Sequence, residues 1–235
     1  MTLPRLPLVG QEETGPSDWN WEFAREILPD IAEGLWVTVR LTLLSMVLAM
    51  VLGLMLAILR RSRVRAVSWP VGLVVDFIRS TPLIVQLFFL FFVLPDLGLE
   101  LSAWSTAVLG LGVHYACYTS ESYRAGIESV PTGQWEAATA VNLSTAVTWR
   151  QVVLPQAIPT VLPALGNYLV ASFKDAPIAS VIGVAGILAS AQAIQSQTFS
   201  GMEPFTVTGV LFLAVSIPAA TLARYLERRY GYQRD

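Results

Sequence analysis

The stretch that decides the fold class is LWVTVRLTLLSMVLAMVLGLMLAIL, residues 35–59, in which Arg40 is the only charged residue. A helix needs about 20 apolar residues to cross the hydrocarbon core of a bilayer, because its backbone polar groups must be satisfied within the segment. The composition agrees, since 54% of the 235 residues are hydrophobic and the mean hydropathy is +0.57. We therefore expect an all-α, polytopic membrane protein.

Four further segments are apolar enough to span a bilayer: Val74–Leu94, Leu101–Ser120, Val152–Phe173 and Phe205–Ala223. The segment from Val152 contains three prolines at four-residue spacing, which favours a helix that starts near Ile158. The stretch Ala176–Ile194 is also apolar, but it is rich in Gly, Ala and Ser.

Arginine clusters predict the orientation, because Lys and Arg accumulate in short cytoplasmic loops. One cluster follows the first span and one follows the last: Arg60, Arg61, Arg63 and Arg65, then Arg224, Arg228, Arg229 and Arg234. If both flanks are cytoplasmic the number of spans is odd, so we expect five, with the N-terminus outside and the C-terminus inside. Ala176–Ile194 is then a re-entrant or partial helix on the outer side. The chain divides into an extracytoplasmic leader (1–33), a transmembrane domain (34–224) and a cytoplasmic tail (225–235).

The cytoplasmic loop between the third and fourth spans, about residues 125–155, is longer than a simple connector. Helix-forming residues at Trp135–Ala140 and an amphipathic stretch at Ser144–Val153 predict a helix-turn-helix on the inner face of the membrane. Such a surface can dock a soluble partner. On spacing alone, a merely solvated loop is an equal alternative, because Trp and Ala are common at membrane surfaces.

The same loop resembles the cytoplasmic signature of the permeases of binding-protein-dependent ABC importers. That signature is Glu-Ala-Ala, three residues, Gly, nine residues, a β-branched residue, any residue and Leu-Pro. This chain matches it with Glu136, Ala137, Ala138, Val152, Leu154 and Pro155. Asn142 stands where the family has Gly, and the turn is expected to be kept because Asn also adopts left-handed backbone angles.

Other stretches resemble the polar amino-acid branch of that family. They are Glu33–Leu35 with Thr38, Phe77–Gln86, Tyr118–Ile127, and Asn167 with Phe173–Ser180. Within the branch, Lys174-Asp175-Ala176-Pro177 is most similar to ectoine and hydroxyectoine permeases.

The resemblance implies an assembly in the bacterial inner membrane, with several partners. These are a second permease subunit, as a copy or a paralogue, two cytoplasmic ATPases and an extracytoplasmic solute-binding protein. The solute would be ectoine, hydroxyectoine or a polar amino acid. The residues expected to couple the permease to its ATPase are Gly133, Glu136, Ala137, Ala138, Asn142, Leu154 and Pro155.

Polar residues inside spans are costly, so they tend to face a bundle interior or a solute path. The candidates for a solute path are Gln86, Tyr118, Glu121 and Asn167. The alternatives are structural. Gln86 and Asn167 can hydrogen-bond across helices, and we favour an ion pair with Arg124, one helical turn away, for Glu121. His114 is expected to be a packing residue and Arg79 an interface anchor.

Several classes of function are disfavoured. No Gly-x-x-x-x-Gly-Lys-[Ser/Thr] loop occurs and the sole lysine, Lys174, falls at the outer face, so we expect no enzyme and ATP hydrolysis on another polypeptide. Cys117 is the only cysteine, and we expect no metal and no cofactor. The formal charge of -2 gives no basic surface for nucleic acid. An intramembrane enzyme and a secondary transporter remain as alternatives.

Overall fold

The computed structural model describes residues 19–230, and within this range every regular element is helical, which confirms the expected all-α class. The α-helices are α1 (Trp21–Glu26), α2 (Leu28–Arg60), α3 (Arg65–Ser80), α4 (Leu83–Phe88), α5 (Ala103–Glu128), α6 (Thr132–Ala140), α7 (Thr145–Val147), α8 (Leu154–Asp175), α9 (Ile187–Thr198) and α10 (Met202–Tyr230). Two π-helical turns (Phe89–Val93, Thr148–Val153) and two 3₁₀ turns (Leu94–Leu97, Ala176–Ile182) extend them. Parts of the predicted leader (1–18) and tail (231–235, with Arg234) lie outside the described residues.

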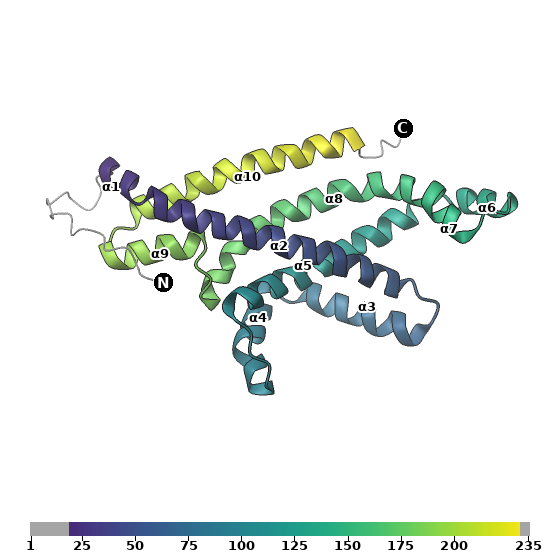
Figure 1. Ribbon diagram of the computed structural model, residues 1–235, viewed down its shortest axis with the longest axis horizontal. Helices are drawn as coiled ribbons and strands as arrows, with labels where there is room; N and C mark the ends of the chain where they lie inside the picture. Colours follow the sequence, from purple (N-terminus) through teal and green to yellow (C-terminus); the bar gives the residue numbers. More distant parts are fainter. Residues whose placement is uncertain (1–18, 231–235) are drawn as a thin grey trace.

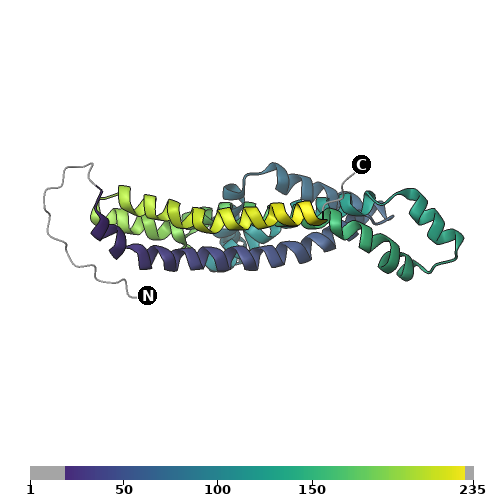
Figure 2. The same cartoon turned by 90° about the horizontal axis from the view of Figure 1, so that it is seen from above.

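The long helices α2, α5, α8 and α10 run side by side along the longest axis of the molecule (Figures 1 and 2). Helix α5 packs against both α2 and α8, and α10 packs against α8. Small residues allow the closest approach: a Cβ added at Gly53 of α2 would lie 2.9 Å from the carbonyl oxygen of Ala116 on α5. Backbones therefore meet where a glycine faces the neighbouring helix.

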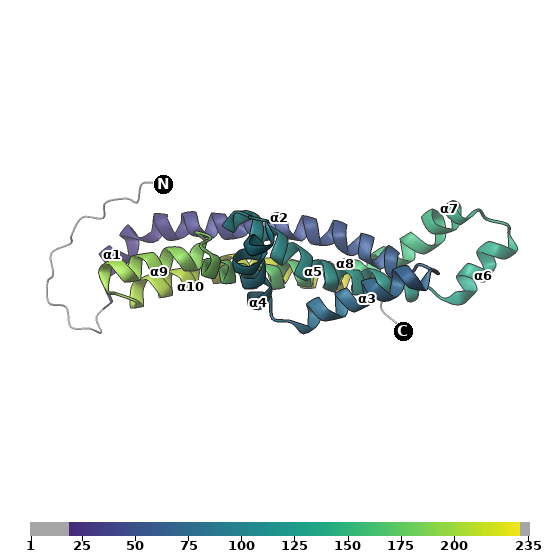
Figure 3. The same ribbon diagram turned by 90° about the horizontal axis from the view of Figure 1, so that it is seen from below.

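The two ends of this bundle differ in what they carry (Figures 1 and 3). We call one the arginine end, because α2 and α10 both end there in arginines and the α6–α7 hairpin projects from it. Helices α1 and α9 lie at the opposite end. The three segments that the sequence predicts to be cytoplasmic thus share one end.

Three segments are long and apolar enough to cross a bilayer: Leu28–Arg60, Thr145–Ile182 and Met202–Arg229. The pair Arg65–Ser80 and Leu83–Leu97 makes a fourth if it counts as one broken span. Helix α5, with 26 residues, is long enough but is not among these apolar segments, since it carries buried polar residues such as Thr106 and Ser120. Five spans and their orientation stay predictions.

The predicted span Val74–Leu94 is wrong as a single straight helix. Helix α3 ends at Ser80, and the chain bends by 108° before α4 continues. Pro82 explains the break, because a proline disfavours the helical region for the residue before it, and Thr81 has an extended ψ of 140°. The α4 segment consequently leaves the bundle sideways (Figure 1).

The predicted helix start near Ile158 is also wrong. Helical structure runs from Thr145 to Ile182, with Pro155 in the first turn of α8 and two further prolines inside it. A π-helical turn at Thr148–Val153 ends just before Pro155. Its wider hydrogen-bonding pattern accommodates the proline ring, which cannot donate a backbone hydrogen bond. Packing against α5 and α10 holds the remainder in helical form.

Ala176–Ile194 does not form a sixth span. Its first seven residues are a 3₁₀ turn that prolongs α8, and Gly183, with a left-handed φ of 86°, ends that turn. Helix α9 then has 12 residues, or about 18 Å, against about 30 Å of hydrocarbon. The hydroxyl oxygen of Thr38 on α2 accepts the N–H of Ile187 at 3.0 Å, which ties the start of α9 to the bundle.

Candidate functional site

Four aromatic side chains gather where α5 meets α8. His114, Tyr115 and Tyr118 come from α5 and Tyr168 from α8. Ring centroids lie 5.1 Å apart for His114 and Tyr118, 6.4 Å for Tyr115 and Tyr168, and 5.9 Å for Tyr118 and Tyr168. We call these four residues the aromatic cluster. His114 and Tyr115 are buried, whereas Tyr118 and Tyr168 are half-buried, so the cluster has an accessible side.

A carboxylate and an amide border the aromatic cluster. The hydroxyl of Tyr115 donates to Oδ2 of Asp175 at 2.6 Å, and Asp175 is half-buried at the end of α8. Gln86 Oε1 lies 3.2 Å from His114 Nδ1, while Gln86 Nε2 donates to the carbonyl oxygens of Ile78 at 2.8 Å and Thr81 at 3.1 Å. Gln86 therefore stabilises the backbone at the Pro82 break and contacts the His114 ring. This is the structural role that the sequence left open for Gln86.

Arg79 supplies the opposite charge. Its guanidinium carbon lies 5.2 Å from the Tyr118 ring centroid, within cation–π range. The Tyr118 hydroxyl donates a long hydrogen bond of 3.4 Å to the Arg79 carbonyl oxygen. Arg79 forms no ion pair with any residue of the described range. The expected interface anchor thus stands beside the aromatic cluster with an unneutralised charge.

The solute-path candidates from the sequence do not all meet. Gln86 and Tyr118 belong to this site, but Asn167 is exposed on α8 and makes no side-chain hydrogen bond to a described residue. Tyr115, Tyr168 and Asp175 belong to the site and were not among the candidates. The three-residue spacing of two tyrosines on α5 was a signal for Tyr115, whereas the meeting of α5 with α8 is visible only in three dimensions.

Glu121 lies in an ion-pair network away from the aromatic cluster. Its Oε2 accepts from Arg124 Nη2 at 2.7 Å, so the expected pair is present, and its Oε1 contacts Nη1 of Arg60 at the end of α2. Arg124 also donates to Glu128 at 2.7 Å. The network links α2 to α5 at the arginine end, which supports the structural reading of Glu121.

The α6–α7 hairpin has the turn that its sequence predicts. Asn142 adopts a left-handed φ of 54°, which confirms the expectation, and its N–H donates to the carbonyl of Thr139 at 3.0 Å. The Trp135 and Trp149 rings meet edge to face with centroids 5.5 Å apart and join the two arms. Their packing makes the hairpin a stiff unit connected to α5 and α8.

The coupling candidates divide between the surface and the interior of this hairpin. Gly133, Glu136, Ala137, Asn142, Leu154 and Pro155 are exposed, whereas Ala138 is 4% exposed. Ala138 therefore packs inside the hairpin, and the coupling role of this set stays a prediction. Glu136 lies in the middle of α6, which begins at Thr132, and its side chain is exposed.

Comparison with known proteins agrees with this geometry. Residues 49–232 match the family described as "Binding-protein-dependent transport system inner membrane component". A probable amino-acid ABC transporter permease of Sinorhizobium fredii is 45% identical over 205 residues, which are 87% of this chain and 89% of the relative. A probable amino-acid ABC transporter permease of Bacillus subtilis is 34% identical over 214 residues, covering 91% and 95%.

A solved structure, "Crystal structure of an amino acid ABC transporter with histidines", has a similar fold. Its TM-score is 0.85 at 32% identity, with 90% of this chain and 99% of that chain covered. Sequence and fold agree over most of the described range, and the matched residues include the aromatic cluster and the hairpin. This chain belongs to the family of binding-protein-dependent transport system inner membrane components.

Proposed function

We propose that this chain is the permease subunit of an ATP-binding-cassette importer that carries an amino acid or another compact zwitterion across the bacterial inner membrane. The observation that carries the proposal is that two groups of opposite charge, Asp175 and Arg79, both border the aromatic cluster. Tyr115 holds Asp175, and the neighbouring Tyr118 ring faces the Arg79 guanidinium. A solute with an ammonium and a carboxylate finds a countercharge for each, and the tyrosine rings favour the cation.

Polar amino acids are the first candidates, because both permease relatives are described as amino-acid transporters. Ectoine and hydroxyectoine are also compact zwitterions. The reason to consider them is the similarity of Lys174-Asp175-Ala176-Pro177 to ectoine and hydroxyectoine permeases. We therefore include them in the solute class that we propose.

Uptake competition tests this class. Cells that express the whole gene cluster would take up a labelled amino acid, and unlabelled amino acids, ectoine and hydroxyectoine would be added as competitors. We expect zwitterions to compete and sugars or metal ions not to. Competition by a sugar or a metal ion alone would overturn the proposal.

The proposed assembly contains a second permease chain, two ATPases that hydrolyse ATP on the inner side, and a solute-binding protein on the outer side. Within it, the α6–α7 hairpin transmits movement of the ATPases to the spans. Both of its ends continue into long helices, and it projects beyond the arginine end (Figure 1). Glu136 on its exposed surface is the acidic group available for a basic partner residue.

A further inference from the structure

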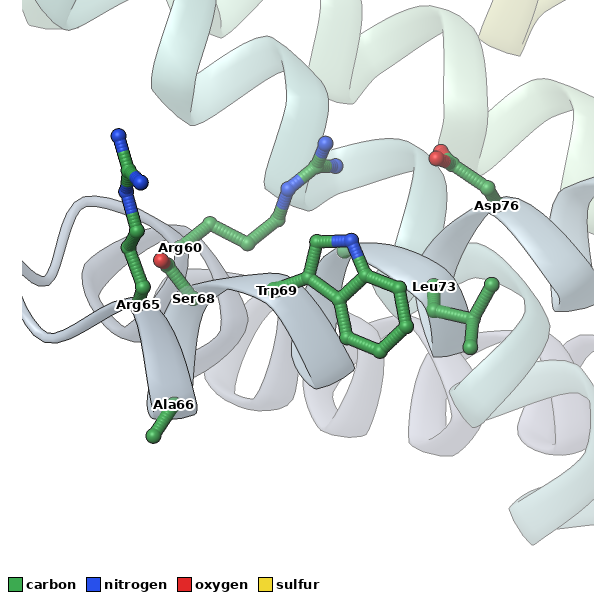
Figure 4. Close-up of a pocket in the computed structure, with 8 residues that line it drawn as sticks. Arg60, Arg65, Ala66, Ser68, Trp69, Leu73 and Asp76 are labelled. Atoms are coloured by element: carbon green, nitrogen blue, oxygen red, sulfur yellow. The ribbon is translucent and has the colours of Figure 1, made fainter.

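A cavity of about 730 Å³ lies between the end of α2 and helix α3, away from the aromatic cluster. Its size is within the range of small-molecule sites. Arg60 of α2 and Arg65, Ser68, Trp69, Leu73 and Asp76 of α3 line it. Figure 4 shows Arg60, Arg65 and Asp76 pointing to the same side of α3, with the Trp69 ring beside Arg60. The solute path described above makes no use of these groups.

The charges of the cavity are only partly neutralised. Arg60 uses Nη1 for Glu121, whereas its Nε and Nη2 face α3, each 3.9 Å from where a Cβ at Gly72 would lie. Arg65 and Asp76 form no ion pair with each other, with Arg60 or with any other described residue. Two cationic groups and one carboxylate thus border the same open space.

The beginning of helix α3 has the features of a helix end at a membrane surface. Trp69 is 72% exposed and Phe77 66%, on the same helix as Leu73 at 58%. Three arginines lie at or just before its beginning: Arg65 is its first residue, Arg63 lies in the preceding turn, and Arg61 caps the end of α2. An exposed apolar stripe is typical of a face that contacts lipid, and a Trp with basic residues at one end is typical of a helix end at the level of the lipid headgroups.

We propose that this cavity binds the headgroup of a phosphatidylethanolamine molecule. The phosphate accepts hydrogen bonds from Arg60, Arg65 and the hydroxyl of Ser68, and the ammonium donates to Asp76. Leu73 and the Trp69 ring contact the part of the acyl chains next to the headgroup. Phosphatidylglycerol has a phosphate but no amine, so it offers Asp76 only neutral hydroxyl donors and no countercharge. The cavity therefore prefers phosphatidylethanolamine to phosphatidylglycerol.

Native mass spectrometry of the full chain, purified with its co-expressed partners and delipidated, tests the proposal. Phosphatidylethanolamine or phosphatidylglycerol is added, and bound lipid per permease chain is counted. We expect one retained phosphatidylethanolamine. Arg65→Gln should weaken the binding of phosphatidylethanolamine about tenfold, because one charge-assisted hydrogen bond to the phosphate is lost. Asp76→Asn should bring the affinities for the two lipids close together. Arg63→Gln, outside the cavity, is the matched control.

Equal retention of both lipids by the unaltered protein would overturn the proposal, as would equal effects of Arg65→Gln and Arg63→Gln. A change in oligomeric state with Arg65→Gln while lipid binding stays constant would assign the cavity to a second copy of the chain, and so would also overturn it. The measurement reads bound lipid and not transport, so its result is independent of the proposed solute.

Discussion

The substitution Asp175→Asn probes the proposed solute site most sharply, because it removes a charge and keeps the shape. The Asp175 carboxylate accepts the Tyr115 hydroxyl at 2.6 Å, and an amide oxygen can still accept it. The exchange of a charged for a neutral acceptor costs the fold about 1 kcal/mol. The protein should therefore remain inserted at near-normal level.

Asp175→Asn should weaken solute binding more than it destabilises the fold. A charge-assisted hydrogen bond between the solute ammonium and a half-buried carboxylate contributes about 1.5–3 kcal/mol, so the KM for uptake should rise roughly 10- to 100-fold. The assay is initial-rate uptake in cells that express the whole cluster, with membrane-inserted protein quantified in parallel.

Two control variants separate the explanations. Tyr115→Phe keeps the carboxylate and removes only its orienting hydroxyl, so its KM should rise only a few-fold. Lys174→Gln changes the charge of the exposed neighbouring residue and should leave the KM unchanged. An unaltered KM for Asp175→Asn, or an equal effect of Lys174→Gln, would refute the assignment of Asp175 to the solute site.

Three further predictions concern packing, coupling and topology. Gly53→Val should lower the free energy of unfolding by about 1–3 kcal/mol, because the added side chain overpacks against α5. Gly209→Val is the control and should be neutral, because Gly209 has open space around it. Equal effects of the two substitutions would contradict the packing of α2 against α5. Glu136→Lys should abolish solute-stimulated ATP hydrolysis in an intact assembly, whereas Ala138→Asp tests only hairpin stability, because Ala138 is buried; normal stimulation with Glu136→Lys would exclude the coupling role. Reporter fusions should read inside, outside, inside, outside and inside after Arg65, Gly98, Ser144, Gln197 and Asp235; a cytoplasmic reading at Gln197 would contradict the five-span topology.

The parts of the structure that were predictable from sequence depend on local chemistry. Helix α2 follows from its long apolar run, and the left-handed turn at Asn142 follows from the conformational freedom of that side chain. The pair Glu121–Arg124 follows from three-residue helical spacing. Each of these features is specified within a few neighbouring residues.

The features that the sequence did not predict depend on how the helices pack and are rotated against each other. Tyr115 and Asp175 are 60 residues apart in sequence, and Arg60 and Glu121 are 61 apart, so no local pattern joins them. The bend at Pro82 had a local signal, but the apolar run on both sides of it favoured one continuous helix. Tertiary packing and the backbone restriction before proline decided these features.

Transport by the reconstituted assembly tests the central claim most directly. The chain, its second permease, the ATPases and the solute-binding protein would be placed in liposomes, and amino-acid uptake would be measured with and without ATP. We predict uptake only when the complete assembly, the loaded binding protein and ATP are present together, and none by this chain alone. ATP-independent uptake by the isolated chain would contradict the account and identify a secondary transporter.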